Sequence, residues 1–238
     1  MRPGAVWAAS RVAILAVACA AAPLGAEEPP RSAGALRARV VAADAGHGGK
    51  DLGVVISGVR EKDISLALAR MLREAAAEFP GFSVALTRDA DEYLPLSSRV
   101  LKATSAGAQA LLSFHVDERR GRGRTGVTLY AFGYNRLIPK ALVRKDETPL
   151  PDPSRESIAR SRQLAARLHA ALREAGIPVG EIEYGGFRVL KGAMPSVLVE
   201  LGNLRDPESA ARAMDPKFQR RLCRALLQGV SAHLSSEK

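Results

Sequence analysis

The chain has 238 residues, of which 47% are hydrophobic and 5% aromatic, and its formal net charge is +10 at pH 7. A chain of this length and composition can bury an ordinary globular core, which excludes a disordered, collagen-like or disulfide-stapled protein. The positive charge favours an anionic partner such as a nucleic acid, a membrane surface or an acidic polymer.

The first 26 residues have the pattern of a secretory signal peptide. Arg2 and Arg11 flank a positive amino-terminal region, and residues 12–22 form an apolar run that is too short to span a membrane. The small residue Ala26 is followed at once by polar residues, so we expect cleavage after Ala26 and a linker over residues 27–37. Export disfavours a nucleic-acid partner, and the low aromatic content offers little surface for base stacking.

The cysteines bear on anchoring and on redox state. Residues 16–19 form a weak lipoprotein box that would tether the mature chain through a lipid on Cys19, but the box lacks leucine at its first position. Cleavage after Ala26 would instead leave Cys223 alone, which excludes an internal disulfide. Because Cys223 lies within an apolar helical pattern, we expect it to be a small core residue.

Strand and helix patterns alternate along the rest of the chain. We expect strands at residues 36–44, 82–87, 109–114, 126–132, 187–190 and 196–200. We expect helices at residues 61–78, 96–106 and 154–175, a helical stretch opening at 206–208, and a closing helix with apolar residues from 218 to 229. This alternation predicts an α/β fold, a single domain with a central, mostly parallel twisted sheet of about six strands flanked by helices.

Two segments show no regular period. Residues 119–124 (RRGRGR) form a basic glycine loop, which we interpret as a solvated loop in preference to a contact for an anionic surface. Residues 133–153 hold four prolines and several charges, so we expect a long surface excursion.

Several polar residues follow or end predicted strands. Asp44 ends the first strand and His47 follows it, His115 closes the third and Glu200 ends the last. In parallel sheets reactive groups gather at the carboxyl ends of strands, so these residues are expected to converge. Each also has a plain structural explanation as a polar residue at a strand end. Likewise, Glu61 at a helix start suits the helix dipole without any ligand.

Five short motifs occur in an order found in one family. They are residues 44–51 (DAGHGGKD), 61–63 (EKD), 86–89 (LTRD), 113–115 (SFH) and 194–202 (MPSVLVELG). Together they resemble the zinc-dependent N-acetylmuramoyl-L-alanine amidases of the amidase-3 family, the bacterial cell-wall amidases. The resemblance covers residues 38–234, which would form the catalytic domain.

The resemblance implies that His47, Glu61 and His115 bind Zn²⁺ and that Glu200 is the catalytic glutamate. It leaves the substrate-binding residues unknown. Two imidazoles and a carboxylate form a three-ligand set typical of catalytic zinc. The implied reaction cleaves the amide between N-acetylmuramic acid and L-alanine of the peptidoglycan stem peptide, in cell-wall remodelling or daughter-cell separation. The enzyme would work in the periplasm or cell envelope.

Three positions depart from the family pattern. Ala45 replaces a proline, which should affect only loop rigidity. Asp117 replaces the usual asparagine after the second histidine, and its charge would either tighten the metal or repel an anionic substrate. Asn203 stands where an aromatic residue is usual, and Arg205 and Asp206 replace a later Ser-Asn pair, so the substrate groove is expected to differ.

Peptidoglycan is the implied partner, with a protein activator or anchor as a second. Regulated members of the family carry a helical plug, and the short segment 133–153 predicts that this chain lacks the full plug. Membrane contact is expected only through the signal peptide or, as the weaker alternative, a lipid on Cys19. Two other functions stay open: a zinc amidase or peptidase acting on another exported amide, and a wall-binding regulator with weakened turnover. The intact His47, Glu61, His115 and Glu200 argue against the regulator.

Overall fold

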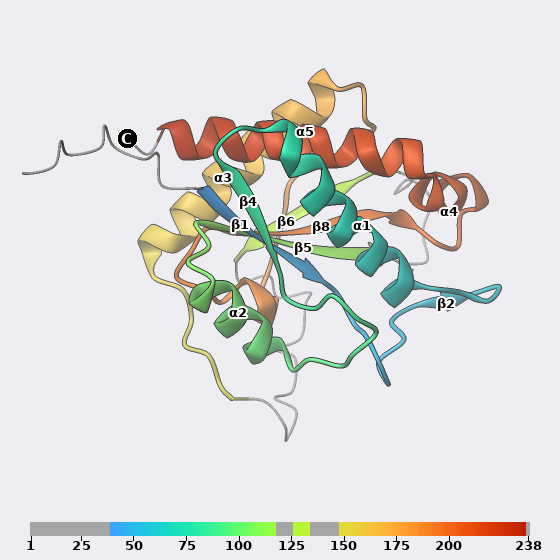
Figure 1. Cartoon of the computed structure of the whole chain (residues 1–238), viewed down its shortest axis with the longest axis horizontal. Helices are drawn as coiled ribbons and strands as arrows, with labels where there is room; N and C mark the ends of the chain where they lie inside the picture. The colour runs from blue at the N-terminus through green and yellow to red at the C-terminus, as the bar shows by residue number, and fades with distance from the viewer. Residues whose placement is uncertain (1–38, 118–125, 134–147, 237–238) are drawn as a thin grey trace, which may run out of the picture. The chain divides into compact units, whose positions relative to one another are not determined.

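The computed structural model describes residues 39–117, 126–133 and 148–236 (Figure 1). A six-stranded sheet runs in the order β4-β1-β5-β8-β6-β7. Its strands are β1 (Arg39–Ala45), β4 (Phe82–Leu86), β5 (Ala110–Asp117), β6 (Thr128–Phe132), β7 (Glu183–Gly185) and β8 (Ser196–Asn203). Strands β4, β1, β5 and β8 are mutually parallel, whereas β6 is antiparallel to β8 and parallel to β7. The predicted α/β fold with a mostly parallel sheet is confirmed.

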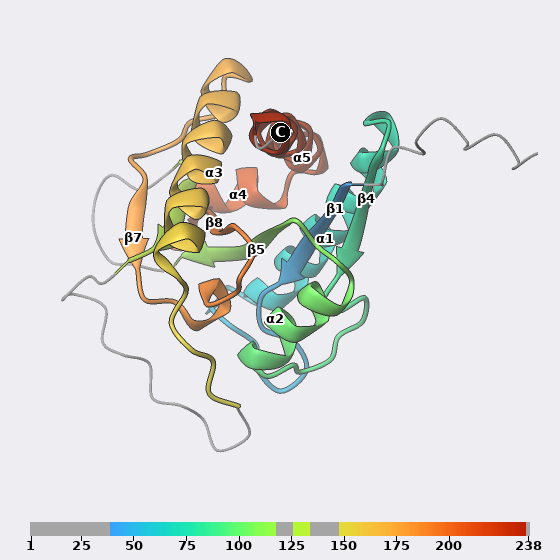
Figure 2. The same ribbon diagram turned by 90° about the vertical axis from the view of Figure 1, so that its left-hand side faces the viewer.

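Helices cover both faces of the sheet (Figure 2). They are α1 (Glu61–Ala75), α2 (Leu96–Ser105), α3 (Arg155–Glu174), α4 (Pro207–Met214) and α5 (Pro216–Ser236), with 3₁₀ turns η1 (Ala76–Glu78) and η2 (Arg188–Leu190). Alternate residues of a strand face opposite sides of a sheet. Val41 of β1 accordingly packs in the larger core with α1, α3 and α5, and Ala42 packs in the smaller core with α2 and η2.

Local chemistry sets where the helices begin. The Ser154 hydroxyl accepts a hydrogen bond from the Ser157 amide at 3.0 Å and caps α3. Asp206 caps α4 in the same way, accepting from the Ser209 amide at 2.7 Å. Cys223 is fully buried on α5, which confirms it as a core residue, and burial raises the pKa of its thiol.

One predicted strand is wrong, and two β elements were not predicted. Residues 187–190 form the 3₁₀ turn η2 and not a strand, because a short apolar run has no period that separates a strand from a buried turn. The sixth strand of the sheet is β7, which was not predicted from the sequence. The small hairpin of β2 (Val55–Ile56) and β3 (Val59–Arg60) is also unanticipated. Its turn residues Ser57 and Gly58 have φ of 50° and 82°, as a type I′ turn requires.

Strands β5 and β8 continue beyond their predicted ends. His115 and Glu200 therefore lie inside strands and not at their final residues. The strands extend because each pairs with the other up to Asp117 and Asn203.

Several predicted segments lie outside the described residues: the signal peptide, the linker, the basic loop 119–124 and residues 134–147 of the excursion. Among the residues that are described, no helix combines the length and hydrophobicity needed to cross a membrane.

Candidate metal centre

The loop after β1 presents His47 in an unusual backbone conformation. Its φ is 58°, a left-handed value that residues other than glycine rarely adopt. Such strain persists only where surrounding contacts hold it. Here the Arg99 guanidinium donates to the His47 carbonyl at 2.6 Å, and Gly48 and Asp51 exchange backbone hydrogen bonds of 2.8 and 3.1 Å.

Two arginines buried beneath this loop tie its backbone to the rest of the fold. Arg88 and Arg99 are each 1% exposed. Arg88 donates to the carbonyls of Ala45, Gly46, Lys62 and Ala90. Arg99 donates to the carbonyls of Ala45, Leu94 and His47. Because Lys62 follows Glu61 directly, Arg88 links the loop that carries His47 to the start of α1.

Asp44 supports this arrangement from within the sheet. It is 1% exposed and accepts hydrogen bonds from the hydroxyls of Thr87 and Ser113, both at 2.6 Å, and from Arg99 at 3.0 Å. Burial alone would raise the pKa of the Asp44 carboxyl, but Arg99 and the two hydroxyls more than offset this and lower it. Asp44 therefore has a structural role, and it is not part of the ligand cluster described next.

His47, Glu61 and His115 lie together although they come from three elements. Their ligand atoms all fall within 4.8 Å of one another, a spacing that could hold a metal ion. His47 Nε2 lies 3.1 Å from Glu61 Oε2, and His115 Nδ1 lies 2.9 Å from Glu61 Oε1. The loop after β1, the first residue of α1 and strand β5 supply one side chain of the cluster each.

The Glu61 carboxylate is oriented by the backbone. Its Oε2 accepts from the Val54 amide at 2.9 Å, and its Oε1 accepts from the Val116 amide at 3.0 Å. Burial raises the pKa of Glu61, but the hydrogen bonds to His115 and His47 outweigh it, so the pKa lies well below its ordinary value. Glu61 is therefore a carboxylate at neutral pH.

Asp51 orients the first histidine. Its Oδ1 lies 2.9 Å from His47 Nδ1, which leaves His47 Nε2 facing Glu61. Burial of His47 lowers the pKa of its imidazole, but the hydrogen bonds and charges of Glu61 and Asp51 outweigh it and raise the pKa. Asp51 was not predicted to have a role in the site. The signal available was a carboxylate four residues after His47 in a glycine-rich motif.

Two glycines leave room for the three side chains of the cluster. A Cβ at Gly46 would collide with the His115 ring and lie 2.7 Å from the Phe114 carbonyl oxygen. A Cβ at Gly53 would lie 2.5 Å from Glu61 Oε2 and 2.7 Å from the His47 ring. Only glycine fits where the backbone passes this close to the cluster.

Glu200 stands next to His115 across the sheet. The two residues are register partners on the parallel strands β8 and β5. Neighbouring strands are about 4.8 Å apart, and residues in register project to the same face. Glu200 is half-buried, and its partner on the other side is Thr128 of β6.

Two departures from the family pattern meet on the same pair of strands. Asp117 of β5 and Asn203 of β8 are register partners. Asn203 is 6% exposed; its amide donates to the Ser209 hydroxyl, and its side-chain oxygen accepts from the Arg205 amide, both at 2.8 Å. Asn203 therefore shapes the connection from β8 to α4. Ala45 ends β1 and is fully buried.

Comparison with known proteins identifies the family to which the chain belongs. Residues 41–232 match the Amidase_3 family, described as N-acetylmuramoyl-L-alanine amidase. The chain belongs to this family.

Relatives and solved structures agree. The chain is 30% identical to N-acetylmuramoyl-L-alanine amidase AmiC of Escherichia coli O6:H1, over 87% of this chain and 55% of that protein. It is 26% identical to AmiC of Neisseria meningitidis serogroup B, over 84% of this chain and 54% of that protein. The chain thus spans about half the length of these curated relatives. The catalytic domain of CwlV, an amidase from Bacillus (Paenibacillus) polymyxa var. colistinus, superimposes with a TM-score of 0.67 at 29% identity, over 83% of this chain and 98% of that domain.

Proposed function

We propose that this protein is a zinc-dependent peptidoglycan hydrolase. Its reaction would be cleavage of the amide between N-acetylmuramic acid and L-alanine of the stem peptide. The observation that carries the proposal is the convergence of His47, Glu61 and His115 within 4.8 Å, in a chain of the amidase family. The expected biological setting is cell-wall remodelling or daughter-cell separation.

The donor set fits Zn²⁺ better than Ca²⁺ or Mg²⁺. Two imidazole nitrogens and one carboxylate oxygen are preferred by zinc, whereas calcium and magnesium favour oxygen ligands. Three protein ligands leave a position open, as in catalytic zinc sites. When bound, the zinc ion would polarise the scissile carbonyl and lower the pKa of the attacking water.

Glu200 is proposed as the general base and then the general acid. Its register position beside His115 supports this role, because it would bring a carboxylate near the proposed metal ligands. There it would accept a proton from the attacking water and then deliver it to the departing amine of L-alanine. Glu61 and His47 would stay fixed during the reaction, because the Val54 and Val116 amides hold Glu61 and Asp51 holds His47.

We propose an exported enzyme, acting in the periplasm or cell envelope. Residues 1–26 would be the signal peptide, 27–37 a linker and 38–234 the catalytic domain. Lipidation at Cys19 is the alternative to cleavage after Ala26. Peptidoglycan is the proposed partner, and a protein activator or anchor would account for localisation in the wall.

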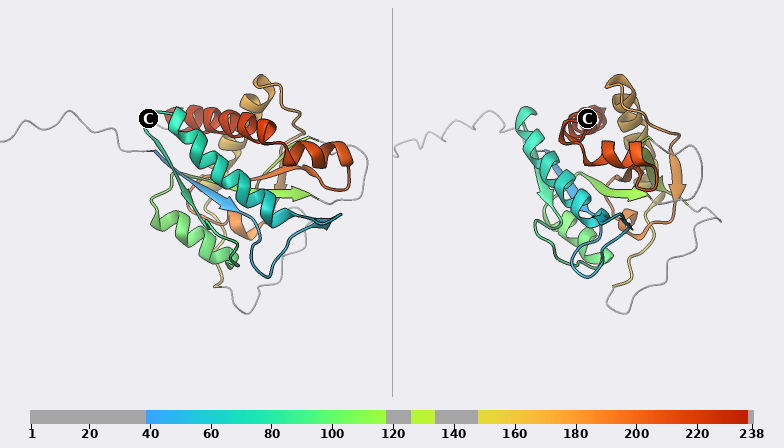
Figure 3. Two further views of the ribbon diagram at one scale, coloured as in Figure 1. Left: turned by 45° about the vertical axis from the view of Figure 1, so that its right-hand side comes forward. Right: turned by 90° about the vertical axis from the view of Figure 1, so that its right-hand side faces the viewer.

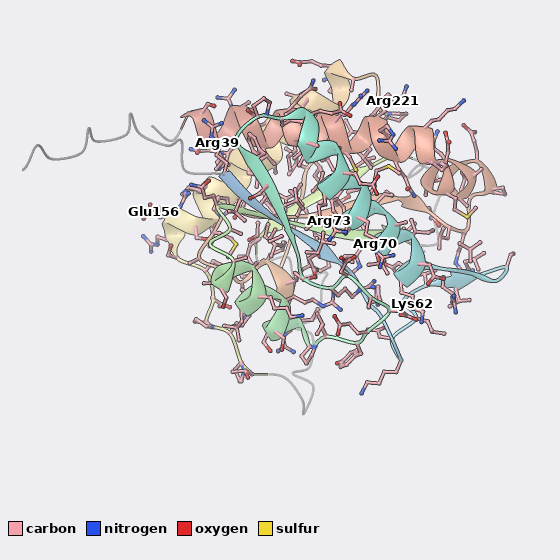
Figure 4. The ribbon with its side chains drawn as sticks, viewed as in Figure 1. Arg39, Lys62, Arg70, Arg73, Glu156 and Arg221 are labelled. Carbon is pink, nitrogen blue, oxygen red and sulfur yellow. The ribbon has the colours of Figure 1, made fainter. Side chains whose placement is uncertain are left out.

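The decisive experiment gives purified mature protein to peptidoglycan with and without a chelator. Turnover should release new alanine amino termini, and the chelator should abolish the release. Glu200→Gln should retain zinc but lose turnover by roughly 10²- to 10⁴-fold, because the proton acceptor is gone. Glu156→Gln, on the exposed start of α3 (Figure 4), is the matched control and should stay active.

The other outcomes separate the alternatives. Release of a different amino terminus would indicate another exported amide as substrate. Zinc binding and wall binding without any cleavage, even after addition of cell-envelope extract, would indicate a regulator and contradict the proposal.

A further inference from the structure

A hollow opens at the junction of α4 and α5. Neither helix carries a residue of the proposed chemistry. Its volume is about 570 Å³. The residues that line it are Ala211, Arg212, Asp215, Lys217, Phe218 and Arg221.

Positive charge dominates this α4–α5 pocket. Three of its lining residues are cations, and the single carboxylate, Asp215, is engaged by the backbone, since it accepts from the amides of Lys217 at 3.0 Å and Phe218 at 3.3 Å. Arg212 contacts Glu208 at 3.5 Å. Within the described part of the chain, Lys217 and Arg221 form no ion pair with a carboxylate.

The pocket also has a preformed wall. Phe218 is 5% exposed, and the Arg221 guanidinium lies over its ring at 5.9 Å from the centroid. Stacking restricts the guanidinium, so less conformational freedom is lost when it binds an anion. Figure 4 shows Arg221 on the outer side of α5.

The pocket lies at the same end of the sheet as the candidate metal centre. Helix α4 follows β8, the strand that carries Glu200, and packs against it. Figures 1 and 3 show α4 at the end toward which β5 and β8 run, the end that also holds the β2–β3 hairpin. A polymer crossing the metal centre could therefore extend toward the pocket.

We propose that the α4–α5 pocket binds a carboxylate group of a peptidoglycan stem peptide other than the peptide being cleaved. This inference rests on the proposed function. Stem peptides repeat along a glycan strand and carry free carboxylates, which a guanidinium recognises with paired hydrogen bonds. A second contact on the same polymer would raise the local concentration of amide bonds at the metal centre.

The test measures binding to purified sacculi from which other covalently attached polymers have been removed. All proteins carry Glu200→Gln, so the wall stays intact. Lys217→Gln with Arg221→Gln removes two pocket charges, and Arg220→Gln with Arg224→Gln removes two charges from the same helix outside the pocket. We expect the pocket pair to weaken co-sedimentation roughly 10-fold, and the control pair less than about 2-fold.

A second arm identifies the ligand. Sacculi whose stem-peptide carboxylates have been converted to amides should bind the parent protein weakly. On these sacculi the pocket variant and the control variant should co-sediment equally. The proposal is overturned if both pairs lose binding equally, which would indicate general charge attraction, or if the difference survives amidation. Thermal unfolding of each variant checks that the fold is retained.

Failure here and failure of the proposed function are distinguishable. Cleavage of a short soluble muropeptide by the Lys217→Gln, Arg221→Gln protein with Glu200 restored depends on the metal centre alone. It should match the parent enzyme whether or not the pocket binds the wall.

Discussion

Two of the three side chains in the candidate metal centre touch a group outside the cluster that orients them independently of any ion. Backbone amides hold Glu61, and the Asp51 carboxylate contacts the ring nitrogen of His47 that faces away from Glu61. A carboxylate behind a ligating histidine fixes its tautomer and makes it a better ligand. Asp51 is therefore a positioning residue for the proposed zinc site.

Asp51→Asn should weaken zinc binding by about 10- to 100-fold, because the amide loses the negative charge that supports the His47 imidazole. Competition against a chromophoric chelator measures this affinity without reference to activity. Asp63→Asn is the matched control, since Asp63 makes its contact to Arg60 on the exposed side of the same region. Equal zinc affinity in the two variants would contradict a positioning role for Asp51.

At the scale of elements, the centre depends on how the loop after β1 and the start of α1 are joined. Arg88 bonds to the backbone of both, and Arg99 of α2 reaches Asp44 and the His47 carbonyl. The strain at His47 is thus balanced by contacts from a helix on the opposite side of the sheet from α1. Loss of either arginine should loosen the ligand geometry before it disrupts the strands.

Arg99→Met should lower the free energy of unfolding by about 3–5 kcal/mol, because it leaves the Asp44 carboxylate buried without its cation. Urea denaturation measures the loss. Arg70→Met is the control, because Arg70 lies on the exposed surface of α1 (Figure 4), where it pairs with Asp89. This variant should lose far less free energy of unfolding. Similar losses of unfolding free energy in the two variants would show that the buried Arg99–Asp44 pair contributes no more to stability than the exposed pair.

Arg99→Met should also change how the free energy of unfolding depends on pH in acid solution. The Asp44 pKa is lowered in the folded protein, so its contribution to stability is present above the ordinary value of 3.8 and is lost as the pH falls below it. Without Arg99 the folded-state pKa rises toward that value. The decline in unfolding free energy between about pH 4 and pH 2 should therefore be shallower in Arg99→Met than in the parent protein.

At the scale of the whole molecule, metal binding should couple to global stability, because the ligands come from three elements distant in sequence. A hundredfold excess of zinc over its dissociation constant stabilises a protein by about 2.7 kcal/mol. For a domain of this size we expect a rise of about 5–10 °C in Tm.

Thermal unfolding of metal-free protein, with and without added Zn²⁺, measures this rise. His47→Ala should remove most of the zinc effect, and Mg²⁺ should produce little in either protein. A zinc-induced rise that is the same in His47→Ala and the parent would place the bound ion elsewhere.

The sequence predictions are most accurate where the interactions involved join residues that are close in sequence. Long periodic segments such as α1, α3 and α5 were predictable, because their apolar stripes repeat every turn. The capping role of Ser154 was also predictable, since a cap acts within one turn. The strand predicted at 187–190 fails, because a short apolar run does not specify whether it will find a pairing edge.

The alternation of strands and helices, the buried faces and the motifs that contain the site residues can all be read from the amino-acid sequence, since these features depend on neighbours in the chain. The site residues in those motifs are His47, Glu61, His115 and Glu200. The three-dimensional fold was needed to see that three of these side chains meet, that Asp44 pairs with Arg99, and that Asp117 and Asn203 are register partners. Strand order and helix docking set those distances, and both arise from packing between residues far apart in sequence. The same packing brings Arg212 of α4 and Arg221 of α5 to one pocket.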